Sequence, residues 1–147
     1  MKTPLTFLLI FFFFFFLTIH HSKAQVTLSY HLSDLSFVGV NTMIGKRFMP
    51  ELRLGVNQDV EDVDVELNVF YLFKRRPSFQ WYGGAGIRRS DIFEGLAFPT
   101  GLNIYPFERK NFGFQMEVAG LYGSGNARLR GSVGIRYRFD KKDKKRE

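Results

Sequence analysis

The chain has 147 residues, contains no cysteine and carries a formal net charge of +7. The absence of cysteine excludes a small scaffold held together by disulfides, and with so few histidines it also excludes the usual zinc-binding spacings. This length corresponds to a single domain.

The first 24 residues predict a cleavable secretory signal peptide. A basic residue, Lys2, precedes an apolar stretch at 7–19, and the tripeptide at 22–24 places small residues at the −3 and −1 positions of a cleavage site before Gln25. The alternative is an uncleaved membrane anchor, but about 13 apolar residues fall short of the roughly 20 that a spanning helix needs. Cleavage would remove two lysines and lower the net charge from +7 to +5.

From Gln25 onward apolar side chains recur at every second position, which predicts β-strands rather than helices. The predicted strands cover residues 24–32, 38–48, 51–57, 63–73, 79–87, 96–104, 111–122 and 128–139. The turns predicted between them lie at 33–34, 49–50, 58–62, 75–78, 89–94, 108–111 and 123–126. Short links between successive strands predict antiparallel hairpins in an up-and-down order. Pro99 cannot donate a ladder hydrogen bond, so we expect a bulge or a frayed strand end there.

An eight-stranded meander with one apolar face is expected to close into a barrel, because open edges promote aggregation. The aromatic residues decide whether that barrel lies in water or in lipid. If the chain ends on the periplasmic side, the turns at 49–50, 75–78 and 108–111 are the lower turns of the barrel. The aromatic residues gather at the level of these turns, and the middles of the strands above them are aliphatic. The aromatic set is Phe48, Tyr71, Phe73, Phe79, Trp81, Phe107, Phe112, Phe114, Tyr137 and Phe139. Such a girdle predicts an all-β, eight-stranded, antiparallel, up-and-down transmembrane β-barrel.

The opposite face of the strands carries charges of both signs. A barrel of eight strands encloses only enough room for side chains, so these charges are expected to fill the lumen rather than line a pore. The charge network predicted there consists of Arg53, Glu66, Glu117, Arg130 and Arg136. Pairing along the hairpins should place Glu66 diagonal to Arg53, and Glu117 diagonal to Arg130. Unpaired buried charge would cost several kcal/mol, which is why both signs are needed.

The segment GSVGIRYRFD, residues 131–140, ends the last predicted strand. Its pattern of polar-x-Gly-x-x-aromatic-x-aromatic is met by Ser132, Gly134, Tyr137 and Phe139. It resembles the C-terminal assembly signal of bacterial outer-membrane β-barrel proteins, which the outer-membrane insertase reads as the final strand. The charged tail at 140–147 departs from that pattern, because many such signals end the chain at the aromatic residue.

Longer segments, GLNIYPFERKNFGFQMEVA and LRGSVGIRYRF, look like those of the small, functionally uncharacterised outer-membrane barrel proteins of Gram-negative bacteria. The resemblance implies a bacterial outer-membrane location, the lipid bilayer as surroundings and the insertase as a partner during assembly. We expect a barrel domain at 25–139, a monomer, and no nucleic-acid partner.

Catalytic chemistry finds little support in the sequence. His31 with Ser33 and Asp34 could sit together at the first upper turn, but Ser and Asp are also ordinary turn residues. We therefore predict no enzyme activity, cofactor or metal. The leading hypothesis is a structural or interaction barrel of the outer membrane. The alternatives are a soluble secreted or periplasmic barrel that binds an apolar small ligand, and a narrow pore or lipid-modifying enzyme.

Overall fold

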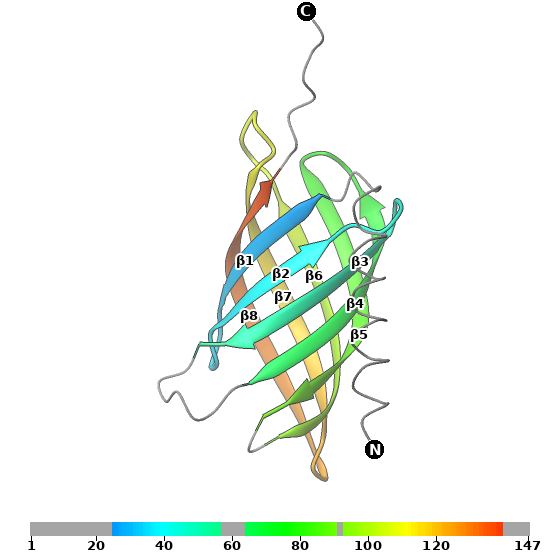
Figure 1. Ribbon diagram of the computed structural model, residues 1–147, viewed down its shortest axis with the longest axis vertical. Coiled ribbons are helices and arrows are strands. Elements are labelled where there is room, and N and C mark those ends of the chain that lie inside the picture. The colour runs from blue at the N-terminus through cyan, green and yellow to red at the C-terminus, as the bar shows by residue number, and fades with distance from the viewer. Residues whose placement is uncertain (1–24, 57–63, 91–92, 140–147) are drawn as a thin grey trace, which may run out of the picture.

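The computed structural model describes residues 25–56, 64–90 and 93–139 of the chain. They form eight antiparallel strands (Figure 1). The strands are β1 (Val26–Leu32), β2 (Phe37–Thr42), β3 (Phe48–Gly55), β4 (Val65–Arg75), β5 (Phe79–Arg89), β6 (Glu94–Ile104), β7 (Phe112–Gly123) and β8 (Asn126–Phe139). The predicted signal peptide at 1–24 and the charged tail at 140–147 lie outside the described residues.

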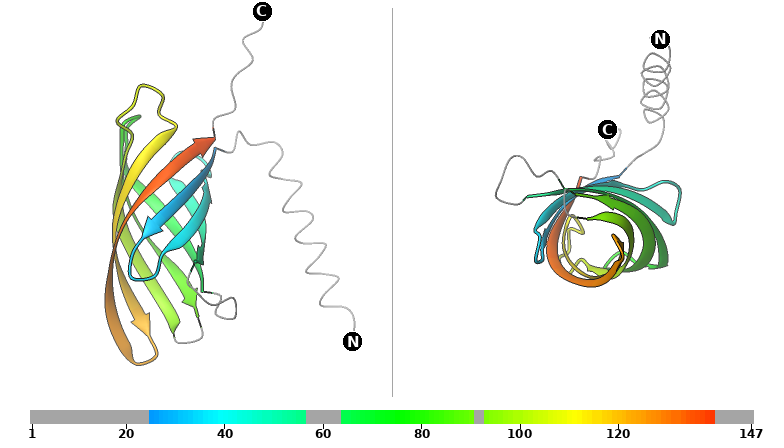
Figure 2. Two further views of the ribbon diagram at one scale, coloured as in Figure 1. Left: turned by 90° about the vertical axis from the view of Figure 1, so that its left-hand side faces the viewer. Right: turned by 90° about the horizontal axis from the view of Figure 1, so that it is seen from below.

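The strands pair in sequence order, and β8 pairs back onto β1 to close the barrel. In this last pairing Val26 lies opposite Phe139 and Leu32 lies opposite Val133, so the barrel begins and ends at the same rim. The view along the axis in Figure 2 shows the closed ring. The predicted fold class, an all-β up-and-down barrel of eight antiparallel strands, is confirmed. Within the described ranges, no helix is long and apolar enough to cross a membrane.

Side chains alternate between the two faces of every strand, because successive Cβ atoms of a strand point to opposite sides. In β1 the outward side chains are Val26, Leu28, Tyr30 and Leu32, whereas the inward ones are Thr27, Ser29 and His31. The outward residues are 39–55% exposed and the inward ones are at most 3% exposed. The barrel is therefore apolar on its outside and largely polar on its inside.

The turn predicted at 49–50 is wrong. The chain instead turns at 43–47, where Gly45 has a φ of 66° and the Ile44 N–H donates to the Phe48 carbonyl over 2.8 Å. Glycine adopts this left-handed conformation at little steric cost. Pro50 lies inside β3, one residue before Glu51, and pairing with β2 begins only at Glu51. A proline is tolerated there because that edge of the strand has no ladder partner.

The bulge or frayed end expected at Pro99 is not found, although the β5–β6 ladder lapses there, with partners for Thr100 and Ala97 but none for Pro99 and Phe98 between them. Strand β6 continues through Pro99, which pairs with Ala119 of β7. A register shift between described strands lies on β4, between Leu72 and Lys74. Phe73 is the extra residue, and a Cβ on Gly83 of the neighbouring strand would come within 2.8 Å of its ring. The glycine thus makes room for a ring that the bulge directs outward.

The hairpin between β7 and β8 lies where the sequence predicts a turn, at 123–126. Ser124 and Gly125 have φ angles of 50° and 76°, and Gly123 pairs with Asn126 on either side of them. Two central residues with positive φ match the right-handed twist of the flanking strands.

Aromatic side chains gather at the rim where the barrel begins and ends, which we call the aromatic end. Ring contacts link Phe48 to Tyr71, Tyr71 to Phe73, and Phe73 to Trp81, with centroid separations of 5.5, 5.6 and 5.0 Å. Further contacts at this rim join Phe107 to Phe112, Phe112 to Phe114, and Tyr137 to Phe139. These rings point away from the lumen, so the belt encircles the outside of the barrel.

Candidate functional site

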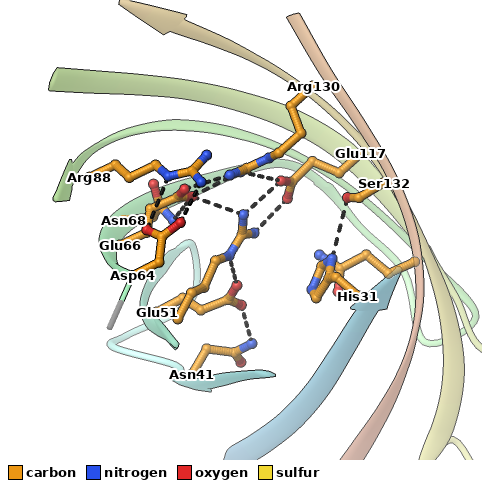
Figure 3. Close-up of polar contacts among 12 residues, drawn as sticks. His31, Asn41, Glu51, Asp64, Glu66, Asn68, Arg88, Glu117, Arg130 and Ser132 are labelled. Carbon is orange, nitrogen blue, oxygen red and sulfur yellow. Dashed lines mark hydrogen bonds and ion pairs between the residues drawn. The ribbon is translucent and has the colours of Figure 1, made fainter. Parts of the chain in front are cut away.

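The lumen is the candidate functional site, because charged side chains from several strands converge in it (Figure 3). Arg53 of β3 lies directly opposite Glu66 of β4 in the ladder. Across the barrel, Glu117 of β7 lies opposite Ser132 of β8, which leaves Glu117 diagonal to Arg130. Strand parity thus aims all four charged side chains at the barrel axis.

Arg53 is the centre of the cluster and is 1% exposed. Its Nη1 and Nη2 atoms donate to the two carboxylate oxygens of Glu117 over 2.7 and 2.6 Å. Nη1 also donates to Glu66 over 3.1 Å, and Nε donates to Glu51. One guanidinium therefore binds three carboxylates, two of them on its own side of the lumen and one on the opposite wall.

Arg130 crosses the lumen in the other direction. Its Nη1 and Nη2 atoms donate to both carboxylate oxygens of Glu66 over 2.6 and 3.0 Å, and Nη2 lies 3.7 Å from Glu117. Paired, parallel N–H···O bonds of this kind fix geometry as well as charge. Glu66 and Glu117 each face both arginines, so β3 and β4 are tied to β7 and β8 through the interior.

Neutral groups occupy further lone pairs of the carboxylates. Asn41 donates to Glu51 over 2.6 Å, Asn68 donates to Glu66 over 2.8 Å, and the Tyr82 hydroxyl donates to Glu117 over 2.7 Å. Gln115 in turn donates to the Tyr82 oxygen. Such bonds matter because a buried charge is tolerated only when its remaining hydrogen-bonding capacity is used.

Aromatic rings form the walls around the two guanidinium groups. The Phe37 ring lies 4.8 Å from the Arg53 guanidinium carbon and 4.9 Å from that of Arg130. His31 stacks on the same ring at 4.3 Å, and the Phe70 ring lies 5.3 Å from Arg53. Cations over ring faces gain electrostatic stabilisation in a dehydrated setting.

The cluster has three carboxylates and two guanidinium groups, so by itself it carries a charge of −1. Arg136, which is 2% exposed, supplies a further positive charge to the lumen but does not join the cluster. Its contacts are the Met49 sulfur at 3.9 Å and the Tyr105 ring at 5.8 Å, and its Nε and Nη1 atoms have no partner among the described residues.

A separate ion pair, Arg88 with Asp64, lies toward the rim opposite the aromatic end. With it, the inward-facing charges other than Arg138 comprise four guanidinium groups and four carboxylates. They are Arg53, Arg88, Arg130 and Arg136, and Glu51, Asp64, Glu66 and Glu117. These eight charges balance, and Arg138, which shares the inward parity of Arg136 and lies 4.2 Å from the buried Tyr105 ring, adds a further positive charge at the aromatic end.

Of the five residues predicted as a lumen network, the structure brings together Arg53, Glu66, Glu117 and Arg130, and leaves Arg136 apart. Arg53 faces Glu66 directly rather than diagonally. The prediction omitted Glu51, which lies two residues before Arg53 on β3 and therefore points to the same inward face. The same parity could have identified the neutral partners Asn41, Asn68, Tyr82 and Gln115.

The predicted assembly segment lies on β8, along the seam that closes the barrel. Tyr137 and Phe139 point outward, 44% and 54% exposed, and their rings are 4.9 Å apart. Ser132 and Gly134 face inward, and a Cβ on Gly134 would come within 2.4 Å of the Tyr30 carbonyl oxygen of β1. Glycine at this position therefore allows β8 to approach β1 closely.

The structure does not assemble the candidate catalytic group. His31 is fully buried, stacks on Phe37, and lies 3.4 Å from the Ser132 hydroxyl through Nδ1. Ser33 and Asp34 instead line a small depression at the mouth opposite the aromatic end. Across the residues with defined positions, no group of three His, Cys, Asp or Glu side chains is arranged to hold a metal ion.

Solved structures of other proteins share the closed, eight-stranded barrel of this chain. The N-terminal β-barrel domain of Pseudomonas aeruginosa OprF has a TM-score of 0.62 to this chain at 17% identity, over 79% of this chain and 96% of that one. The de novo designed barrel TMB2.3 has a TM-score of 0.60 at 14% identity, over 81% and 95% of the two chains.

The Yersinia pestis outer membrane protein Ail has a TM-score of 0.54 at 13% identity, over 81% of this chain and 100% of that one. No family model and no curated protein sequence matches the chain. The protein thus has the fold of the small bacterial outer-membrane β-barrels.

Proposed function

We propose that this protein is a small integral outer-membrane β-barrel with a structural or interaction role in the cell envelope. In this proposal it is exported through a cleaved signal peptide, inserted by the outer-membrane insertase as a monomer, and closed to solutes by its side-chain-filled lumen. The observation that carries the proposal is the inverted distribution of polarity, with ionic groups inside and apolar groups outside.

The outer surface supports a lipid environment. Large apolar side chains such as Val69, Val118 and Val133 are 48–54% exposed in the middle of their strands. In water, so continuous an apolar surface would promote association. The strands from β4 to β8 contain 11 to 14 residues, and a tilted strand needs about 9–11 to cross the hydrocarbon region.

The lumen supports a closed barrel rather than a ligand carrier. The alternative, a soluble barrel that binds an apolar ligand, needs an apolar interior. Here the centre of the interior is filled by Arg53 and its carboxylate partners, which are at most 4% exposed. An apolar ligand could enter only by separating these ion pairs. The same packing argues against a wide aqueous pore.

A charge placed on the outer face distinguishes lipid from water as the surroundings. Val118, in the middle of β7, is 48% exposed, and Ala127 lies on the same outward face near the rim. In a membrane, Val118→Arg should lower the free energy of unfolding by about 2–4 kcal/mol, whereas Ala127→Arg should lower it by about 0–1 kcal/mol. In water, an exposed arginine should cost little at either position.

The measurement is urea-induced unfolding in lipid vesicles, together with fractionation of cells that express the full chain. We expect the protein in the outer-membrane fraction, with a folded band whose gel mobility changes on boiling. Recovery in the soluble fraction, or equal tolerance of the two arginines, would contradict the proposal.

A further inference from the structure

The aromatic end carries a dense set of basic side chains, which we call the basic collar. Its members project from the turns and strand ends of this rim. They are Lys46, Arg47, Lys74, Arg75, Arg76, Arg109, Lys110 and Arg138. The one acidic residue in the same segments (43–48, 74–79, 105–112 and 138–139) is Glu108, so the collar has eight positive charges against one negative, or a net +7.

The opposite rim has no such excess among its described residues. It has the basic residues Arg88, Arg89 and Arg128 and the acidic residues Asp34, Asp64 and Glu94, which balance. The two ends of the barrel therefore differ in charge although they have similar numbers of turns. A general need for solubility would not favour one rim over the other.

Four collar cations are held in place by neutral groups. Arg138 lies over the buried Tyr105 ring at 4.2 Å, and Lys110 donates to the Tyr105 main-chain carbonyl over 3.0 Å. Arg47 lies over the Tyr71 ring at 5.7 Å and donates to its hydroxyl over 3.3 Å. Arg75 donates to the main-chain carbonyl of Lys46 over 3.0 Å. For the residues that the structure places, no collar cation has a carboxylate within ion-pair distance. The charges are thus positioned but not neutralised.

The depth of the collar identifies its partner. Arg47 contacts Tyr71, whose ring also contacts Phe48 and Phe73 in the outer aromatic belt. Aromatic belts lie at the level of lipid headgroups, and basic side chains just beyond them lie at the phosphate level. Arginine and lysine bind phosphate through charge-assisted hydrogen bonds.

We propose that the basic collar binds the headgroups of anionic phospholipids in the leaflet at the aromatic end. The inference rests on the proposed function, since it requires a barrel inserted in a bilayer. It adds a preference for anionic over neutral lipids at one rim, which an apolar outer surface alone does not provide.

The test compares two double variants that each remove two exposed positive charges. Lys46→Gln with Arg76→Gln changes the collar, and Arg89→Gln with Arg128→Gln changes the opposite rim. All four side chains are exposed and make no hydrogen bond or ion pair in the part of the chain described, so neither variant breaks such an interaction. Native mass spectrometry of the folded full chain in a non-ionic detergent would measure binding of added phosphatidylglycerol or phosphatidylcholine.

The unmodified protein should bind phosphatidylglycerol more tightly than phosphatidylcholine. Each charge removed from the collar should weaken phosphatidylglycerol binding by about fivefold, so that the collar double variant loses roughly 25-fold. The opposite-rim variant should bind as the unmodified protein does. A charge-conserving variant, Lys46→Arg with Arg76→Lys, should retain binding, and added salt should weaken it.

Three results would overturn the inference. The collar variant could bind phosphatidylglycerol as tightly as the unmodified protein, or the opposite-rim variant could lose as much. Alternatively, inorganic phosphate at equal concentration could displace the lipid, which would assign the collar to free anions. Heat-modifiable gel mobility is recorded for every variant, because a barrel that does not fold would count against the proposed function instead.

Discussion

Glu117 offers the sharpest test of the lumen, because it accepts hydrogen bonds from both walls. Two come from Arg53 over 2.7 and 2.6 Å, one comes from the Tyr82 hydroxyl over 2.7 Å, and Arg130 lies 3.7 Å away. Glu117→Gln keeps nearly the same shape and removes the charge. Breaking a buried ion pair by removing one partner costs about 3–5 kcal/mol. Since Glu51 and Glu66 still contact Arg53, we expect the lower end of that range, about 3 kcal/mol.

Two further variants calibrate this value. Tyr82→Phe removes the hydrogen bond to the same carboxylate, together with the acceptor of the Gln115 amide, and should cost about 1.5–3 kcal/mol. Glu94→Gln removes an exposed carboxylate at the start of β6 and should change stability by no more than about 0.5 kcal/mol. Urea unfolding in lipid vesicles, followed by the fluorescence of the single tryptophan, Trp81, measures all three. If Glu117→Gln unfolds with the same free energy as Glu94→Gln, the charge cluster does not hold the barrel together.

Three other predictions concern export, permeability and assembly. Intact-mass measurement of the exported protein should show a chain that begins at Gln25; retention of residues 1–24 would refute cleavage. Planar-bilayer recording should show little or no steady conductance, and a stable, large single-channel current would mean that the lumen is open. Phe139→Ala, which removes a lipid-facing ring worth on the order of 1–3 kcal/mol, and Tyr137→Ala should reduce the amount of heat-modifiable barrel, whereas deletion of 140–147 should not. Loss of assembly in the tail deletion alone would show that the signal lies elsewhere.

The alternation of residues was sufficient to predict eight strands and to identify the two faces, because the period of a strand is independent of its partners. Turn positions were less secure. Met49 and Pro50 look like a turn, yet β2 ends at Thr42 and the chain reverses around Gly45. Proline was a misleading signal because its effect depends on whether a neighbouring strand needs a backbone N–H donor at that position, which proline lacks. That neighbour is defined only once the strand lengths are known.

The charge cluster was accessible from the sequence only in part. Parity predicts that Arg53, Glu66, Glu117 and Arg130 face inward, and hairpin pairing predicts which of them are neighbours within one wall. It cannot predict that Arg53 contacts Glu117, because that contact depends on the stagger of the closed barrel. Arg136 has the same parity but contacts Met49 and the Tyr105 ring and forms no ion pair with the carboxylates.

The cross-lumen pairs also bear on how the barrel reaches a single structure. Arg53 and Glu117 are separated by 64 residues, as are Glu66 and Arg130, so neither contact can form until the opposite walls are near each other. Hairpin formation and burial of the outer face in lipid can proceed without them. A strand slipped by one residue would turn its lumen charges toward lipid, where arginine at the bilayer midplane costs about 2–4 kcal/mol. The main effect of the ionic interior is therefore to fix the register of the strands. Only the native pairing of all eight strands brings three carboxylates and two guanidinium groups into contact.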